Sequence, residues 1–288
     1  MPHVSYISVT YGPTPEIFAL LESVQRHAGD ISYDMTVVTQ PSDEGSMAEE
    51  ISHLAPWVNV IALDSNIGFG LANNLAVKQV EGEFVAFLNP DVVVSEGWLP
   101  PLLSALADPA VFVAAPPLLS AHGYVEEAGQ VMFSDGGSDA VGGPQLSFDY
   151  EQMMFTRDVD YASAACWVTR RSVFTSLGGF DPAYAPAYFE DPDLAFTARS
   201  RGLVSRLVVD RPVVHAHATA TAGRVAYYQA QVDFAVSEIP FQSAQYDRQG
   251  NLLADETQLA ASRPYAYLPI VAGGTAFMYN LKGNGQRI

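Results

Sequence analysis

The stretch Phe84-Val-Ala-Phe-Leu-Asn-Pro-Asp91-Val-Val-Val94 is an apolar run that is interrupted by one polar tripeptide. Its apolar first half predicts a central strand that is covered on both faces of a sheet. Pro90 prevents regular ladder pairing, so we expect the strand to end there and to carry Asn89 and Asp91 at its carboxyl edge. In open α/β sheets that edge is the usual ligand crevice, and such a carboxylate can share a divalent cation with a phosphate-bearing substrate. An ordinary Asx-Pro turn is the alternative interpretation.

Short strands and helices alternate on the amino-terminal side of this stretch. β-Branched, alternating sequence predicts strands over residues 3–10, 35–38 and 58–61. Helices are expected after Thr14, which would be an N-cap with Pro15 at the first helical position, over residues 47–54, and from Gly68 to about Val80. Repeated strand-helix-strand units predict an α/β fold with right-handed crossovers and a parallel sheet.

Downstream, the sequence predicts fewer regular elements. Arg170 and Arg171 are expected to open a helix, in which one of them faces a phosphate or both lie in solvent. Residues 123–147 are rich in glycine and predict a long polar loop, either a substrate lid or an insertion. A further helix is expected from Glu190 to about Ser200.

Composition excludes several classes of protein. The 288 residues include only two lysines, and the formal net charge is -18, which argues against a nucleic-acid surface. An acidic protein of this kind needs a cation to bind an anionic ligand. The single cysteine, Cys166, cannot form an internal disulfide, and the first residues do not resemble a secretory signal. We therefore expect a cytoplasmic protein without a membrane span, and leave peripheral membrane contact open.

Carboxylates at the start of the helix that follows Phe189 are candidates for a general base. A carboxylate within hydrogen-bond reach of an acceptor hydroxyl can remove its proton during attack on an electrophilic carbon. Glu190, Asp191 and Asp193 offer this chemistry. Alternatively, they are acids that complement the helix dipole. His215 and His217 alternate along an expected strand, and His215 could join Asp91 at a metal.

Four ordered motifs together resemble family 2 glycosyltransferases, and rhamnosyltransferase-like members are the most similar. They are residues 66–74, 88–92, 166–171 with 177–181, and 188–194. The resemblance covers about residues 3–222. It implies a GT-A fold with a Rossmann-like mixed sheet and flanking helices, an inverting mechanism, a nucleotide-diphospho-sugar donor, and Mg²⁺ or Mn²⁺ as cofactor.

Carried over by position, the resemblance implies a role for each matching residue. Asp191 is the expected catalytic base with Glu190 beside it, and Asp91 and His215 are the expected metal ligands. Donor-binding positions are Thr10, Tyr11, Thr39, Asn66, Gly68, Asn89 and Asp91. Acceptor-side positions are Ala164, Cys166 and Trp167, with simple packing as the alternative for Cys166.

The chain departs from the family at three places. Thr39 and Gln40 stand where members usually have an Asp-Asn pair, Gly12 replaces a frequent asparagine, and Ala164 replaces a common glycine. For Gly68 and Gly70, close approach of a phosphate to a helix N-terminus and an ordinary capped helix start are both compatible with the residues. These departures keep a catalytically weak nucleotide-sugar-binding protein open as a second function.

The sequence changes character after residue 222. We expect a transferase domain over residues 1–222 and an extension over 223–288, part of which resembles phosphate-binding proteins of ABC transporters. The leading function is transfer of a sugar, with rhamnose as the family-weighted choice, to a saccharide or lipid-linked saccharide in cell-surface polysaccharide or glycolipid assembly. A phosphate-binding module is a third hypothesis. Base, linkage, acceptor identity and oligomeric state are not specified by the sequence.

Overall fold

The computed structural model describes residues 2–133, 138–142, 148–149 and 154–216, together with the backbone of strands at 267–272 and 275–280. Two β-sheets and six α-helices make up the part described between residues 2 and 216, apart from a short hairpin of β9 (Gln130–Met132) and β10 (Ser138–Ala140). Within the described residues, none of the helices has the length and apolar character that a membrane crossing requires.

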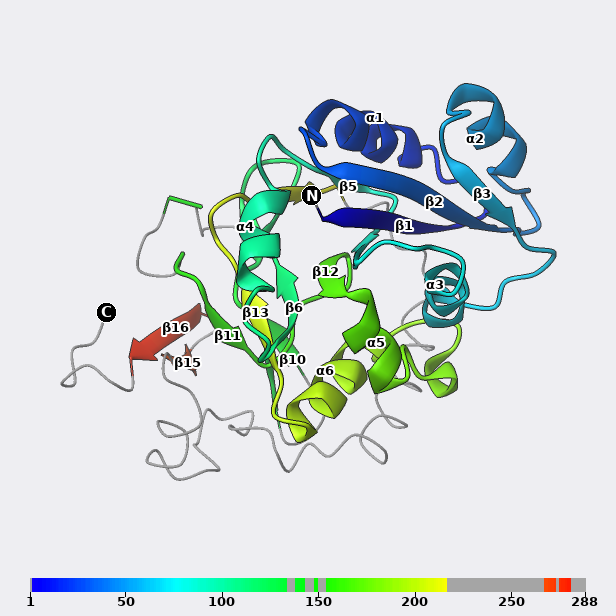
Figure 1. Ribbon diagram of the computed structural model, residues 1–288. Helices are drawn as coiled ribbons and strands as arrows, with labels where there is room; N and C mark the ends of the chain where they lie inside the picture. Colours follow the sequence, from blue (N-terminus) through cyan, green and yellow to red (C-terminus); the bar gives the residue numbers. More distant parts are fainter. Residues whose placement is uncertain are drawn as a thin grey trace.

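The larger sheet has eight strands in the order β11-β13-β6-β12-β4-β1-β2-β3 (Figure 1). Their bounds are β1 His3–Tyr11, β2 Ser32–Gln40, β3 Asn59–Ala62, β4 Phe84–Leu88, β6 Val111–Ala115, β11 Arg157–Val159, β12 Cys166–Arg170 and β13 Val204–Leu207. β4, β1, β2 and β3 run parallel, as the strand-helix repeats predict. β12 is antiparallel to both of its neighbours, so the sheet as a whole is mixed.

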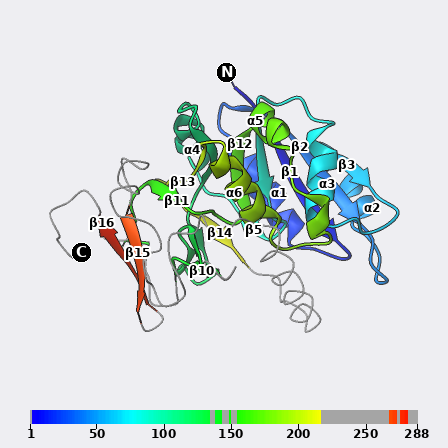
Figure 2. The ribbon, with the colours of Figure 1, turned by 90° about the horizontal axis from the view of Figure 1, so that it is seen from below.

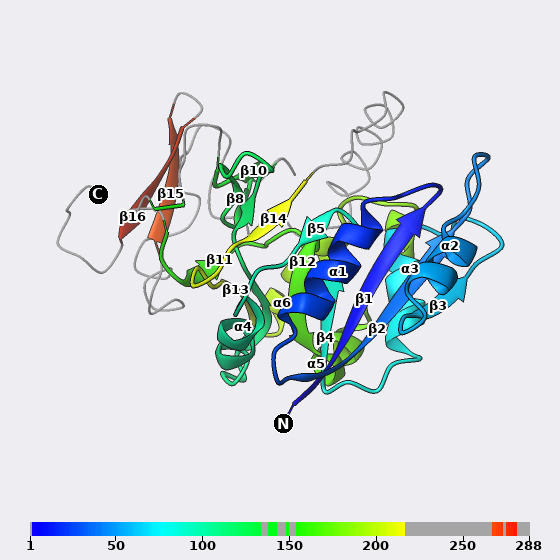
Figure 3. The same cartoon turned by 90° about the horizontal axis from the view of Figure 1, so that it is seen from above.

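Helices cover both faces of this sheet. They are α1 Ile17–His27, α2 Ala48–Leu54, α3 Phe69–Val77, α4 Leu99–Ala105, α5 Arg171–Leu177 and α6 Glu190–Ser200. α1, α2 and α4 contribute to one apolar core, and α3, α5 and α6 contribute to the other (Figures 2 and 3). Adjacent strand residues such as Tyr6 and Ile7 enter opposite cores, because side chains alternate across a strand. β4 is buried along its whole length, as expected for a central strand.

A second, smaller sheet has the order β5-β14-β7-β8. Its strands are β5 Val92–Val93, β14 Val213–His215, β7 Leu118–Leu119 and β8 Val125–Glu127. β8, β9 and β10 all fall within residues 123–147, so the prediction of one long polar loop there is wrong. Alternating burial in the three residues of β8 is too short a pattern to be recognised from sequence.

Two local predictions are also corrected. Thr14 is not an N-cap: its hydroxyl donates to the carbonyls of Tyr11 and Gly12, and the α-helix begins at Ile17 after one turn. Arg170 ends β12, and its guanidinium donates to carbonyls between Leu106 and Val111. The last carbonyls of a helix have no intrahelical partner. The Arg170 guanidinium therefore donates its hydrogen bonds to the segment that follows α4.

The carboxyl-terminal extension is described only by one hairpin, in which β15 (Tyr267–Ala272) pairs antiparallel with β16 (Thr275–Asn280). The remainder of residues 217–288, including His217, lies outside the described residues. The division at residue 222 and the resemblance of the extension to phosphate-binding proteins stay predictions.

Candidate active site

The segment after β4 passes from the larger sheet into the smaller one. β4 ends at Leu88, as Pro90 predicts, and the N–H of Asn89 donates to the carbonyl of Ala165 at 2.8 Å. Val92 then begins β5, where it pairs with His215 of β14. Asn89 and Asp91, both partly exposed, therefore lie at the junction of the two sheets.

Asp91 and His215, the two expected metal ligands, are neighbours. An oxygen of Asp91 lies 3.3 Å from Nε2 of His215, and a Glu126 oxygen lies 3.7 Å from Nδ1. Burial alone would lower the pKa of His215, but the hydrogen bond and charge of Asp91, with the charges of Glu126 and Glu127, raise it. In the described residues no group of three or more His, Cys, Asp or Glu side chains is placed to hold a metal. The protein itself thus offers one close carboxylate-imidazole pair at this junction.

Asp191 lies in the first turn of α6, facing the loop before β12. Its Oδ2 accepts the backbone N–H of Ala164 at 3.1 Å. Burial raises the pKa of Asp191 to about 6, although the N–H of Ala164 opposes the shift. A carboxyl with this pKa is largely ionised at neutral pH, and its raised pKa makes it a better proton acceptor than an ordinary aspartate.

The neighbouring acids have different surroundings. Glu190 is buried, one of its oxygens has no hydrogen-bond partner among the described residues, and burial followed by the Asp191 charge raises its pKa well above the ordinary value. Burial and the charge of Asp181 raise the pKa of Asp193 to about 6, while a hydrogen bond from Tyr184 opposes this. Of these three acids, Asp191 is the one that accepts a hydrogen bond from the acceptor-side loop, which favours it as the base.

The backbone before α6 has an unusual conformation. Tyr188 and Phe189 have φ values of 77° and 71°, in the left-handed region that non-glycine residues rarely adopt. Each such residue costs on the order of 1–3 kcal/mol. This strained pair directly precedes Glu190 and Asp191. Backbone strain is often found next to functional groups.

Thr10 and Thr39 stand opposite each other where β1 and β2 approach their carboxyl ends. Both hydroxyl groups are buried and have no hydrogen-bond partner among the described residues. Tyr11, the next residue, is 57% exposed. Thr10 and Thr39 are both 0% exposed, so Tyr11 is the one of these three that is open to a ligand, and donor contacts through the two hydroxyls stay predictions.

Gln40 is a structural residue that the sequence interpretation recorded only as a departure from the family. Its Oε1 accepts the N–H groups of Ile67 and Gly68 at 2.8 and 3.1 Å. Asn66, which is exposed, accepts the same Gly68 N–H through Oδ1 at 2.8 Å. Gln40 therefore holds the expected donor loop against the end of β2.

The protein's own chain makes the close approach to Gly68. Gly68 has φ 91°, and a Cβ there would lie 2.5 Å from the carbonyl oxygen of Pro186. That carbonyl accepts the N–H of Phe69 at 2.6 Å, and a Cβ on Gly70 would lie 2.9 Å from Phe180. The Gly68 N–H is already shared by two side chains, so a phosphate contact through it, which remains a prediction, would have to displace one of them.

The remaining expected acceptor-side residues lie beneath the loop. Ala164 is buried and contacts Asp191, whereas Cys166 and Trp167 are fully buried in the two cores. Trp167 donates its indole N–H to the carbonyl of Ala162 at 2.7 Å. Burial raises the pKa of the Cys166 thiol, in agreement with the packing interpretation.

Glu126 and Glu127 are part of this junction and were missed because the surrounding residues were interpreted as a loop. Glu127 is 7% exposed and accepts the N–H of Ser163, next to the residue that holds Asp191. The signal in the sequence was a pair of adjacent acids after Tyr124 and Val125, which is too weak to distinguish from a solvated turn.

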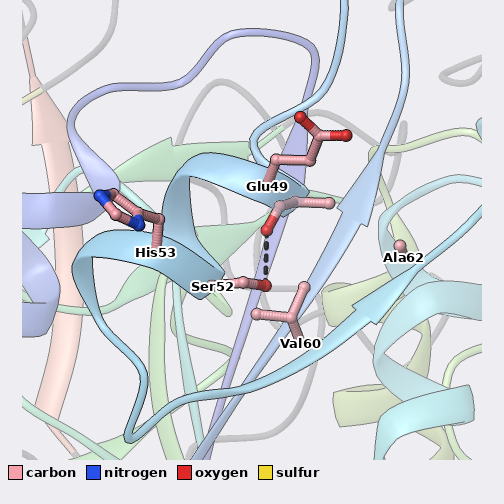
Figure 4. A pocket seen from close by; sticks show the side chains of 6 residues that line it. Glu49, Ser52, His53, Val60 and Ala62 are labelled. Carbon is pink, nitrogen blue, oxygen red and sulfur yellow. Dashed lines mark hydrogen bonds between the residues drawn. The ribbon is translucent and has the colours of Figure 1, made fainter.

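A separate hollow of about 510 Å³ lies over α2 and β3 (Figure 4). Its lining residues are Ala48, Glu49, Ser52, His53, Val60 and Ala62. The hydroxyl of Ser52 donates to the carbonyl of Ala48, as in many helices. None of the expected site residues lines this hollow.

Comparison with known proteins yields a family and a fold. The model of the family described as Glycosyl transferase family 2 matches residues 5–178. The chain is 29% identical over 237 residues to N-acetylglucosaminyl-diphospho-decaprenol L-rhamnosyltransferase of Mycobacterium tuberculosis, with 74% of this chain and 76% of that protein covered. It is 30% identical over 214 residues to O-antigen biosynthesis protein RfbC of Myxococcus xanthus, where the match covers 70% of this chain and only 16% of that protein.

Solved structures agree in fold. The chain is similar to the crystal structure of GalNAc-T7 with UDP, GalNAc and Mn²⁺ (TM-score 0.63, 12% identity, 91% of this chain and 54% of that one covered). Another is S. aureus TarS 1-349 in complex with UDP-GlcNAc (TM-score 0.58, 19% identity, 82% of this chain and 65% of that one). These neighbours are GT-A glycosyltransferases, so the predicted fold class is confirmed.

Proposed function

Because the chain belongs to glycosyl transferase family 2, we propose that it moves a sugar from a nucleotide-diphospho-sugar to a hydroxyl acceptor with inversion at the anomeric carbon. Family membership supports transferase activity. The kind of donor, the kind of acceptor and the inversion of configuration are what we propose. The relatives named for rhamnosyl transfer and O-antigen biosynthesis favour rhamnose as the sugar. They also favour a lipid-linked or polysaccharide acceptor in cell-surface assembly.

One observation carries the proposal: two adjacent residues join the expected base to the expected diphosphate side. Ala164 donates its N–H to Asp191 at 3.1 Å, and Ala165 accepts the N–H of Asn89 at 2.8 Å. Asp91 comes two residues after Asn89 in the chain, and it lies 3.3 Å from His215. One short loop thus links the helix of the base to the segment that carries Asp91. This arrangement suits a displacement in which a hydroxyl loses a proton while a diphosphate leaves.

In this proposal Asp191 removes the proton of the acceptor hydroxyl as the oxygen attacks the anomeric carbon. Its ionised form accepts that proton at neutral pH, consistent with its pKa of about 6. Glu190, whose pKa is raised further by burial, orients Asp191 or the substrate in its protonated form. An inverting displacement needs only one such carboxylate.

A divalent cation fits the residues at the sheet junction. Asp91 supplies a hard oxygen ligand and His215 a nitrogen ligand, with the two atoms 3.3 Å apart, in a protein of net charge -18. Mg²⁺ or Mn²⁺ held there would neutralise charge on the leaving nucleoside diphosphate. Two neighbours are described in complexes with Mn²⁺, which supports the same choice.

Binding of the nucleotide is proposed at the ends of β1 and β2. Tyr11, which is 57% exposed, would provide a stacking surface, and the fully buried Thr10 and Thr39 would support the strand ends that carry it. The loop at Asn66, held by Gln40, lies beside them in the chain topology. A cytoplasmic location belongs to the proposal as well and rests on the lone cysteine.

The test is a screen of nucleotide sugars for metal-dependent binding and turnover. dTDP-rhamnose and UDP-GlcNAc are titrated with Mn²⁺, with Mg²⁺ and with chelator, and release of nucleoside diphosphate is followed with saccharide acceptors by mass spectrometry. We expect metal-dependent binding and transfer to a hydroxyl with inverted configuration. Metal-dependent binding without turnover over a broad panel would instead support a catalytically weak nucleotide-sugar binder.

A further inference from the structure

Glu127 is a buried carboxylate that joins the smaller sheet to the loop before β12. Its Oε1 accepts the backbone N–H of Ser163 at 2.7 Å, and its Oε2 accepts the side-chain amide of Gln130 at 2.6 Å. The residue is 7% exposed. Both oxygens are therefore used by donors that come from other segments of the chain.

Two consecutive backbone N–H groups of that loop hold two different carboxylates. Ser163 donates to Glu127, and Ala164 donates to Asp191. These N–H groups belong to successive peptide units that meet at the Cα of Ser163, so only the φ and ψ angles of Ser163 separate the first donor from the second. The hydroxyl oxygen of Ser163 also accepts the N–H of Ala165 at 3.2 Å, which tightens the same turn.

Glu127 belongs to the sheet that carries the other side of the site. In β8 it stands opposite Leu118 of β7, and β7 is paired with β14, which ends at His215. Through Ser163 it therefore ties the sheet of His215 to the loop that contacts Asp191. Among the described residues, Glu127 is the side chain that accepts the Ser163 N–H.

A buried carboxylate is a costly way to tie two segments together. Burial raises the pKa of Glu127 to about 7, even though the N–H of Ser163 and the amide of Gln130 favour the ionised form. A neutral side chain could accept one N–H at a lower cost of desolvation. The carboxylate accepts both donors at once and places a charge beside Asp191.

We propose that Glu127 is a positioning residue for the transfer reaction. By holding the N–H of Ser163 it fixes the start of this turn, so that the Ala164 N–H keeps Asp191 oriented toward the acceptor hydroxyl. The inference rests on the proposed function. Glu127 acts through backbone groups and contacts neither substrate. It should therefore influence the chemical step more than the affinity for the donor.

The test compares Glu127→Ala and Glu127→Gln with Gln130→Ala, using the full chain and the donor found active in the screen. For Glu127→Ala we expect kcat to fall by about 10–100-fold with donor KM changed by less than about two-fold, since small misplacements of a reacting group have effects of this size. Glu127→Gln keeps an oxygen for the Ser163 N–H and should recover kcat to within about five-fold of wild type. Gln130→Ala, the matched control, removes the other partner and should leave kcat within about two-fold.

Hydrogen exchange provides a readout that does not depend on turnover. The amides of Ser163 and Ala164 should exchange faster in Glu127→Ala than in wild type or Gln130→Ala, because their hydrogen bonds are loosened. If Glu127→Ala does not fold, Glu127→Asp withdraws the carboxylate by one methylene, and the same order of effects is expected with a smaller size.

Several results would overturn the inference. Unchanged kcat in Glu127→Ala, or a donor KM that rises in parallel with the loss of kcat, would show that Glu127 has no role or only supports the fold. No rescue by Glu127→Gln together with unchanged amide exchange would do the same. A wild-type chain that turns over no donor overturns the proposed function and this inference with it, whereas normal wild-type turnover that survives Glu127→Ala overturns the inference alone.

Discussion

Replacement of Asp191 by Asn separates catalysis from folding in this protein. Asn keeps the size of the side chain, and its amide oxygen still accepts the Ala164 N–H that Asp191 accepts at 3.1 Å. What it loses is the ability to take up a proton. We expect turnover to fall by about 10²–10⁴, the range for a positioned general base, while donor affinity stays within a few-fold.

Asp191→Asn should increase the stability of the fold, although it decreases turnover. The pKa of Asp191 is raised from 3.8 to about 6, so between these values the folded chain holds a proton that the unfolded chain has lost, and stability falls as the pH rises through this window. The difference corresponds to at most about 3 kcal/mol at pH 7, and partial exposure of the side chain reduces it. Asp191→Asn should therefore raise the melting temperature by a few degrees at pH 7, and by less at pH 4.

The assay measures turnover of one donor and one acceptor between pH 5 and 8, together with thermal unfolding of each variant. The turnover rate of the wild type should fall below about pH 6, because Asp191 becomes protonated there. Glu190→Gln should reduce kcat less than Asp191→Asn does. Near-normal turnover in Asp191→Asn, together with loss of turnover in Asp193→Asn, would show that Asp193 and not Asp191 is the base. Near-normal turnover in Glu190→Gln, Asp191→Asn and Asp193→Asn alike would refute the mechanism.

Two further predictions concern the metal and the donor loop. Asp91→Ala should abolish Mn²⁺-dependent binding of nucleoside diphosphate in a titration while the far-UV spectrum is unchanged, and His215→Ala should weaken it less; unchanged affinity in Asp91→Ala at saturating metal would contradict the metal assignment. Gly68→Ala places a Cβ 2.5 Å from the Pro186 carbonyl, and Gly29→Ala meets no atom within 4 Å, although both have positive φ. Chemical denaturation should show a loss of about 1–2 kcal/mol for Gly29→Ala and a clearly larger one for Gly68→Ala, and equal losses would show that the contact with Pro186 does not constrain the fold.

The sequence was sufficient for features that depend on neighbours along the chain. The apolar run Phe84–Leu88 and Pro90 specify where β4 lies and where it ends, because strand burial and a missing N–H donor are local properties. The same holds for the parallel order of β1, β2 and β3, which follows from the strand-helix repeats. The resemblance to family 2 also rests on linear motifs, and the family match over residues 5–178 confirms it.

Other predictions failed where a strand was too short to give a recognisable sequence pattern, or where a residue's partner lies far along the chain. Three-residue strands such as β8 give no periodicity, so Glu126 and Glu127 were taken as part of a loop. At Gly68 the sequence indicates a need for space but not its cause, and in the structure the cause is Pro186, far along the chain. Gln40 looked like a loss of donor recognition, whereas its amide oxygen holds the Ile67 and Gly68 N–H groups.

The sequence by itself therefore determined the class of fold, the end of the central strand and the acids at the start of α6. Only the tertiary structure decided which of those acids faces the loop before β12, since Glu190, Asp191 and Asp193 occupy one helical turn and differ only in their surroundings. It also decided that Asp91 meets His215 and that Glu127 meets Ser163. These contacts join residues that are distant in the sequence, and no local pattern encodes them because their partners are selected by how the two sheets pack together.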